Sequence, residues 1–182
     1  MSASNRLRGV ACAIDALNEW LGRAISWLSL LMVLVTVTIV VLRYVFDLGW
    51  IWLQESVIYM HAALFLVGAA YTLKHEGHVR VDIFYQRFSP RGQAWVDLLG
   101  TLGLLLPVCL FILSVSWDYV VQSWSLREGS REAGGLDGVF LLKSLILVMA
   151  FLLVLQGLAL ALRCLDRLMG GPSTAEARDG AS

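Results

Sequence analysis

Four long apolar runs dominate the pattern of hydrophobic and polar residues along the chain. They cover residues 24–42, 56–73, 98–117 and 144–162, and none of them contains Asp, Glu, Lys or Arg. Each run approaches the roughly 20 apolar residues that a helix needs to cross a bilayer. Spanning strands are excluded, because four runs cannot close a barrel and an open sheet edge in lipid would leave backbone groups unpaired. The pattern therefore predicts an all-α integral membrane protein with four transmembrane helices.

The expected division of the chain follows these runs. An amphipathic N-terminal lead-in over 1–23 precedes a four-helix transmembrane domain over 24–168, and the polar tail over 169–182 is expected to be disordered. Pro107 lies inside the third span and cannot donate a hydrogen bond to the carbonyl of Gly103, so we expect a kink there. The four spans are expected at about 24–46, 54–74, 94–124 and 141–165.

Two segments outside the runs show amphipathic helical patterns. In the lead-in, apolar residues recur at helical spacing and polar residues lie off that face. Between the second and third spans, residues 79–89 predict a short interfacial helix that ends before Pro90. That segment also alternates with period two, but a lone strand would have no partner here. The lead-in has apolar Val10, Ile14, Leu17 and Leu21 and polar Asp15, Asn18 and Glu19, and the interfacial segment has apolar Val81, Phe84, Tyr85 and Phe88.

The distribution of Lys and Arg predicts the orientation of the spans. Ten of the fourteen basic residues fall in the N-terminal tail, the second loop and the C-terminal tail, and four fall in the first and third loops. Both termini are therefore expected on the cytoplasmic side, and the glycine-rich third loop is expected to be a flexible periplasmic loop. The ten are Arg6, Arg8, Arg23, Lys74, Arg80, Arg87, Arg91, Arg163, Arg167 and Arg178, and the four are Arg43, Arg127, Arg131 and Lys143.

Composition agrees with lipid as the solvent. Of the 182 residues, 58% are hydrophobic and 15% are charged, whereas soluble domains carry about a quarter charged residues. The mean hydropathy is +0.73, which is more apolar surface than a chain of this length can bury in a water-soluble fold. Basic and acidic residues both number 14, so no basic excess indicates a nucleic-acid partner.

Catalytic and cofactor chemistry finds little support in the sequence. The three cysteines lie far apart with no CxxC spacing, so neither a disulfide framework nor a zinc site is expected. His61 is the histidine within a span, whereas haem held between helices needs two axial ligands. We expect His61 to be a packed, hydrogen-bonded interior residue. No serine lies beside an evident base, so we expect no enzyme activity, no metal and no cofactor in this chain.

The ends of the first two spans carry more information. Arg43 follows the first apolar run, and Trp52 and Glu55 open the second. The connecting loop is short, so Arg43 and Glu55 either pair and fix the hairpin or extend separately to water. Further along the second span, Gly68 begins a group of small residues of the kind that allows helices in lipid to approach closely, and ordinary small-residue content is the alternative reading.

At these residues the chain resembles a known family, the small membrane (Q, DctQ-like) subunit of tripartite ATP-independent periplasmic (TRAP) transporters. The resemblance extends from about the first span to the fourth and rests on the order and spacing of short motifs within the four-span frame. These motifs are Arg43-Tyr44-Val45-Phe46, Trp52 with Glu55, Gly68-Ala69-Ala70, and His75-Glu76-Gly77-His78-Val79-Arg80-Val81-Asp82.

The resemblance implies a small scaffold subunit of a sodium-coupled, binding-protein-dependent importer of organic acids in the bacterial inner membrane. Its partners would be a large elevator-type permease subunit that holds the substrate and sodium sites, a periplasmic substrate-binding protein, and membrane lipids. The resemblance assigns structural or subunit-interface roles to Arg43, Trp52, Glu55, Gly68, His78, Arg80 and Asp82. Exposed charge steers encounter, so Arg127, Glu128, Arg131 and Glu132 are candidates for docking the binding protein, with a merely solvated loop as the alternative.

Two other functions remain open at this point. The first is a membrane anchor of a redox enzyme that holds quinone or haem, against which the single histidine within a span counts. The second is a free-standing small transporter or channel. The absence of Asp, Glu, Lys and Arg from the cores of the four runs counts against it, because buried charge usually marks an ion path.

Overall fold

The computed structural model describes residues 3–75, 77 and 85–169, and within these ranges every regular element is helical. Four helical segments are long and apolar enough to cross a membrane, which confirms the predicted all-α, four-span class. The third segment is built from three consecutive elements without a break. The elements are α1 (Ala3–Val45), α2 (Ile51–Lys74), α4 (Pro90–Gly100), the π-helical turn η1 (Thr101–Leu105), α5 (Leu106–Ser125) and α6 (Val139–Met169).

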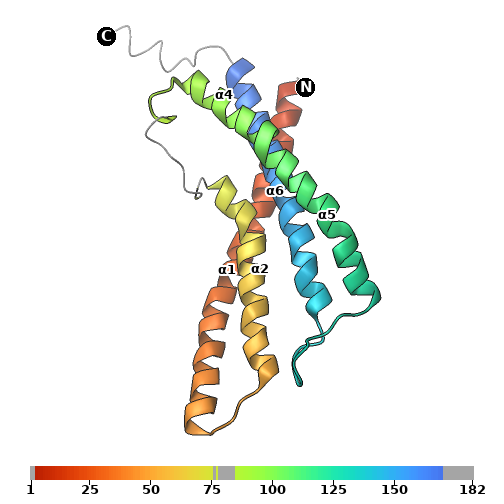
Figure 1. Cartoon of the computed structure of the whole chain (residues 1–182). Coiled ribbons are helices and arrows are strands. Elements are labelled where there is room, and N and C mark those ends of the chain that lie inside the picture. The colour runs from red at the N-terminus through yellow and green to blue at the C-terminus, as the bar shows by residue number, and fades with distance from the viewer. Residues whose placement is uncertain (1–2, 76, 78–84, 170–182) are drawn as a thin grey trace, which may run out of the picture.

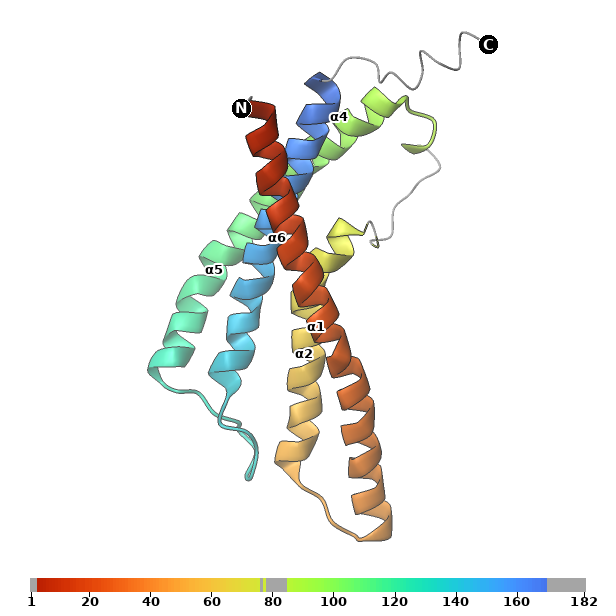
Figure 2. The same ribbon diagram turned by 180° about the vertical axis from the view of Figure 1, so that it is seen from behind.

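Helix α6 is the centre of the fold. It packs against α1, α2, α4, η1 and α5, and Figures 1 and 2 show it running between the α1–α2 hairpin and the α4–α5 helix. The α1–α2 hairpin and the α5–α6 hairpin diverge toward the end that carries the loops 46–50 and 126–138 (Figure 1). We call this end the loop side. The opposite end, where α1 begins and α6 ends, is the terminal side (Figure 1).

The predicted lead-in is part of the first long helix. Helix α1 has 43 residues, or about 65 Å at 1.5 Å per residue, roughly twice the thickness of a bilayer's hydrocarbon core. Its first half extends along α6 toward the terminal side and is no separate surface helix (Figure 2). The predicted interfacial helix over 79–89 lies mostly outside the described residues.

The polar residues of this first half face inward. Asn18 is 1% exposed, whereas Val10, on the predicted apolar face, is 53% exposed. The Asn18 amide donates to Gln156 Oε1 at 2.6 Å, and Gln156 Nε2 donates to Asp15 Oδ1 at 2.9 Å. Asp15 also accepts a hydrogen bond from Arg163. These four side chains form a polar network between α1 and α6, because in lipid the favourable place for polar groups is the inside of the bundle.

A second polar group joins α1 to α2. Glu19 binds Lys74 Nζ at 2.6 Å, His75 Nε2 at 2.8 Å and Arg23 Nε at 2.8 Å. Next to this group, the backbone of α1 approaches α2 at Gly22. A Cβ at Gly22 would lie 2.8 Å from Tyr71 Cβ and closer still to the ring of Tyr71. The missing side chain therefore allows α1 and α2 to pack closely.

The distortion near Pro107 lies in the turn that precedes it. Thr101–Leu105 forms a π turn, in which the Leu106 N–H donates to the carbonyl of Thr101. Proline has no N–H to continue the regular ladder, and π turns within α-helices accommodate such interruptions. A Cβ at Gly157 would lie 3.0 Å from Leu105, so α6 approaches closely at this turn.

Candidate functional site

Glu55 connects the two halves of the loop side. It lies in the first turns of α2, and its carboxylate accepts hydrogen bonds from Ser130 Oγ and, at 2.6 Å, from the backbone N–H of Leu136. A backbone hydrogen bond of 3.1 Å, donated by Trp52 N to Gly134 O, provides a second contact between α2 and this loop. The loop 126–138, which leaves α5 and enters α6, is thereby fixed to the α1–α2 hairpin.

The loop also has internal hydrogen bonds. Ser130 N donates to Leu136 O at 3.0 Å, and Gly135 N donates to Glu132 O at 3.0 Å. Gly134 adopts φ +81, a conformation that favours glycine. A Cβ at Gly135 would lie 2.7 Å from Glu55 Oε2. The glycines that suggested a flexible loop instead allow a compact one, so that expectation is corrected.

Glu128 connects the two ends of the same loop, where α5 ends and α6 begins. Its carboxylate accepts hydrogen bonds from Ser123 Oγ at 2.7 Å and from Lys143 Nζ. The Lys143 ammonium also lies 4.0 Å from the centre of the Tyr119 ring, a favourable cation–π arrangement. The hydrogen bond from Lys143, followed by that from Ser123, lowers the pKa of Glu128 below its ordinary value. This carboxylate is engaged within the chain.

The lowered pKa of Glu128 predicts that the contacts at the α5–α6 end of the loop weaken at low pH. A carboxyl group whose folded pKa is depressed contributes stability above its ordinary pKa of about 4.5, and this contribution is lost as the pH falls toward the depressed value. We therefore expect the amide of Phe140, which donates to Glu128 O at 3.3 Å, to lose hydrogen-exchange protection below about pH 4.5. Exchange rates corrected for the intrinsic pH dependence measure this.

The Glu128→Gln variant is the matched control for this experiment. It keeps an acceptor for Ser123 and Lys143 but has no titrating carboxyl group. Its corrected protection at Phe140 is expected to be lower than that of the native chain at neutral pH and to stay flat with pH. A native chain with the same protection from pH 6 to pH 3 would contradict the assignment.

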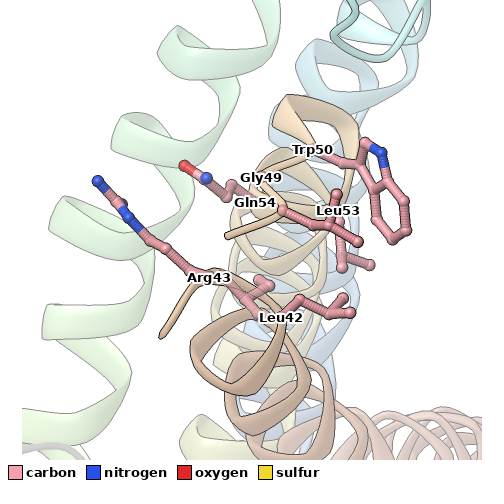
Figure 3. Close-up of a pocket in the computed structure, with 8 residues that line it drawn as sticks. Leu42, Arg43, Gly49, Trp50, Leu53 and Gln54 are labelled. Atoms are coloured by element: carbon pink, nitrogen blue, oxygen red, sulfur yellow. The ribbon is translucent and has the colours of Figure 1, made fainter. Parts of the chain in front are cut away.

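Arg43 does not pair with Glu55. In the part of the chain that the structure describes, Arg43 makes no ion pair, and Glu55 is engaged with the loop instead. Arg43 lines a shallow pocket at the tip of the α1–α2 hairpin together with Gln54, and Figure 3 shows the two polar ends extending to one side while Trp50 points to the other. The pocket volume is about 10 Å³, room for about one water molecule.

The other predicted site residues fall in three places. Trp52 stacks on Trp50 with ring centroids 6.2 Å apart, and Gly68 lies in α2. Arg127, Arg131 and Glu132 lie exposed in the fixed loop. His78, Arg80 and Asp82 lie outside the described residues.

Sequence reasoning missed most of the partners that form these contacts. Ser130, Leu136 and Lys143 gave no local signal, because they meet Glu55 and Glu128 only through the tertiary fold. Gln156 did give a signal, since it is a polar residue inside the fourth apolar run. No group of three metal-binding side chains occurs in the described ranges.

These features define a multi-pass α-helical membrane protein whose polar side chains serve helix and loop contacts. The sequence profile of the DctQ component of tripartite ATP-independent periplasmic transporters matches residues 32–167, and the chain belongs to this family. It is similar to the C4-dicarboxylate TRAP transporter small permease protein DctQ of Vibrio cholerae serotype O1, with 29% identity over 105 residues. The match covers 58% of this chain and 44% of that relative, so the chain spans less than half the relative's length. No solved structure matches the chain.

Membership of the family decides between the functions left open by the sequence. The family is one of TRAP transporter components and not of enzymes, which sets aside the redox-anchor alternative. It is a multi-pass protein of the bacterial inner membrane. The predicted resemblance of the chain to this family is confirmed.

Proposed function

We propose that this chain is the fixed scaffold that braces the large, elevator-type permease subunit of a sodium-coupled importer of organic acids. The observation that carries the proposal is that hydrogen bonds join the helices at both ends of the bundle. On the terminal side, Asp15, Asn18, Gln156 and Arg163 join α1 to α6. On the loop side, Glu55 joins α2 to the loop between α5 and α6.

Such an arrangement suits a subunit whose helices do not move against one another during transport. A carrier that alternates between two sides of the membrane must move one group of helices against another around its substrate site. Here the α1–α2 hairpin is joined to α6 on the terminal side and to the loop between α5 and α6 on the loop side. Movement of one hairpin against the other would therefore break these polar contacts. The cores of the four apolar runs contain no Asp, Glu, Lys or Arg that could mark an ion path, and we place the substrate and sodium sites in the large subunit.

The loop side is the proposed surface for the substrate-binding protein. With both termini cytoplasmic, as the Lys and Arg distribution indicates, the loop 126–138 faces the periplasm. Arg127, Arg131 and Glu132 are exposed there on a backbone held in place by Glu55. A preformed charged loop steers a partner without first having to become ordered. Glu128, the fourth predicted docking residue, is engaged by Lys143 and Ser123 within the chain, so we assign it less of the docking role than the other three.

Reconstitution tests the proposal. The tagged chain is expressed with the large permease subunit from the same source, purified in mild detergent and reconstituted into liposomes with an inward sodium gradient. We expect the two subunits in near-equal amounts, and uptake of an organic acid only when both subunits and the binding protein are present. Uptake by the large subunit without this chain, or recovery of the chain alone, would contradict the scaffold role. Uptake that needs no sodium would contradict the coupling.

A further inference from the structure

His61 lies on the outside of the bundle at the middle of α2. It is about 15 Å along the helix from Ile51 and about 20 Å from Lys74, at 1.5 Å per residue, so it falls near the centre of the bilayer. The side chain is exposed and stacks on Phe65 of the same helix with ring centroids 6.4 Å apart. This corrects the expectation of a packed interior residue.

The imidazole of His61 makes no hydrogen bond to any residue that the structure describes, although its ring carries both an N–H donor and a nitrogen acceptor in the neutral form. Two other polar side chains exposed on a span, Thr36 and Thr38, form local hydrogen bonds instead. The hydroxyl groups of Thr36 and Thr38 donate to the carbonyls of Met32 and Leu34, one turn earlier. A polar ring turned toward hydrocarbon is costly, and such residues normally face protein or water.

The residues around His61 form a seam of the kind along which two helices pack. Gln54, Ile58, His61, Phe65 and Gly68 follow one another at intervals of four, three, four and three residues, the spacing of a coiled-coil contact. Apart from the nearby backbone of α2 itself, no atom lies within 4 Å of the place where a Cβ of Gly68 would stand. The seam therefore ends at a small residue with open space, where a second helix can approach closely.

The opposite face of α2 is already used within the chain. Val67 and Ala70 are buried there in a cluster with Leu152 of α6, against which Leu21 and Ile25 of α1 pack. From Ile58 to Gly68 the seam consequently lies on the side of α2 away from this cluster. Gln54, at the loop-side end of the seam, lines the pocket that α2 shares with Arg43 of α1.

We propose that this seam binds a transmembrane helix of the large permease subunit, and that a polar group of that helix forms a hydrogen bond with His61. The identity of the partner rests on the proposed function, while the seam itself rests on the structure. Lipid tails would cover Ile58 and Phe65 equally well but offer nothing to the imidazole. An adjacent transmembrane helix offers both a packing surface and a hydrogen-bonding partner.

Photo-crosslinking from inside the membrane tests the seam. A benzoylphenylalanine side chain replaces Phe65, which is 70% exposed, or Phe111 of α5, which is 66% exposed and serves as the matched control. In cells that express the whole transporter, we expect Phe65 to crosslink to the large subunit, and Phe111 to do so at least fivefold less. Crosslinks from Phe65 to lipid alone, to a second copy of this chain, or at the level of Phe111 would overturn the proposal.

Substitution of His61 tests the hydrogen bond separately. Hydrogen bonds between membrane helices correspond to roughly a threefold to tenfold change in association, so His61→Leu is expected to reduce recovery of the large subunit by about that factor. His61→Gln, which keeps a donor and an acceptor, is expected to retain most of it. Equal recovery with His61→Leu would overturn the role of the imidazole. If the native chain recovers no large subunit, the proposed function fails; if it does recover it but Phe65 does not crosslink, only the seam fails.

Discussion

Replacing Gly22 with valine is expected to push α1 away from α2 and to destabilise the bundle more than a substitution at any exposed position of α1. Even the first carbon of a new side chain would lie 2.8 Å from Tyr71 Cβ, at the root of the tyrosine side chain, which cannot swing aside without moving α2. Overpacking of this kind costs about 1–3 kcal/mol or more. The contact between Glu19 and Lys74, one turn away, would be weakened together with the packing.

The free energy of unfolding in mixed micelles, followed by tryptophan fluorescence during an SDS titration, measures this effect. Gly9→Val is the control, because no atom lies within 4 Å of a Cβ at Gly9 and valine has a slightly better helix propensity than glycine. We expect Gly9→Val to be neutral or slightly stabilising. Equal midpoints for the two variants would contradict the close approach of α1 and α2 at Gly22.

Substitution of Gln156 by methionine is expected to be the second large loss. Gln156 is 0% exposed and both accepts from Asn18 and donates to Asp15, so methionine of similar volume removes two contacts and leaves the Asn18 amide without its acceptor. A buried polar group that loses its partner costs about 1–3 kcal/mol. We therefore expect a loss of about 2–4 kcal/mol in the same unfolding titration.

A double-mutant cycle separates the hydrogen bond from packing. Combining Gln156→Met with Asn18→Leu removes both polar groups at once, and an apolar pair suits a membrane protein interior. The double variant is expected to lose clearly less stability than the two single variants together. Strictly additive losses would mean that Asn18 and Gln156 do not interact.

The number of spans could be predicted from the sequence, because an apolar run of nearly 20 residues has the length that a helix needs to cross a bilayer. The interpretation of the first half of α1 was less successful. Its helical pattern was correct, but a pattern alone does not say which face is inside. In water the apolar face turns inward, whereas here Asn18 is buried and Val10 and Leu17 of the apolar face are exposed. Leu21 of the same face packs inward, so the buried side of this segment is set by the polar contacts with α6 as well as by apolar packing.

The candidate site was predictable only in part, for a different reason. Glu55 was singled out by its place at the start of the second span, but its partners lie at Ser130 and Leu136, 75 and 81 residues further along the chain. No periodicity reports such distant contacts. The nearest opposite charge, Arg43, was the natural choice from the sequence, and the glycine content of the loop concealed the backbone conformation that brings Leu136 to Glu55.

The π turn at Thr101–Leu105 has a consequence for how the length of this chain can vary over evolution. A π turn closes its hydrogen bond over one residue more than an α turn. Loss of one residue within it would leave a regular helix, with the buried faces of α4 and α5 still pointing toward α6. The same deletion near the middle of α6 would rotate every later residue by about 100°, and Arg163 would turn away from Asp15. The helical segment from Pro90 to Ser125 thus has a place at which a one-residue deletion is tolerated, and α6 has no comparable place in its described residues.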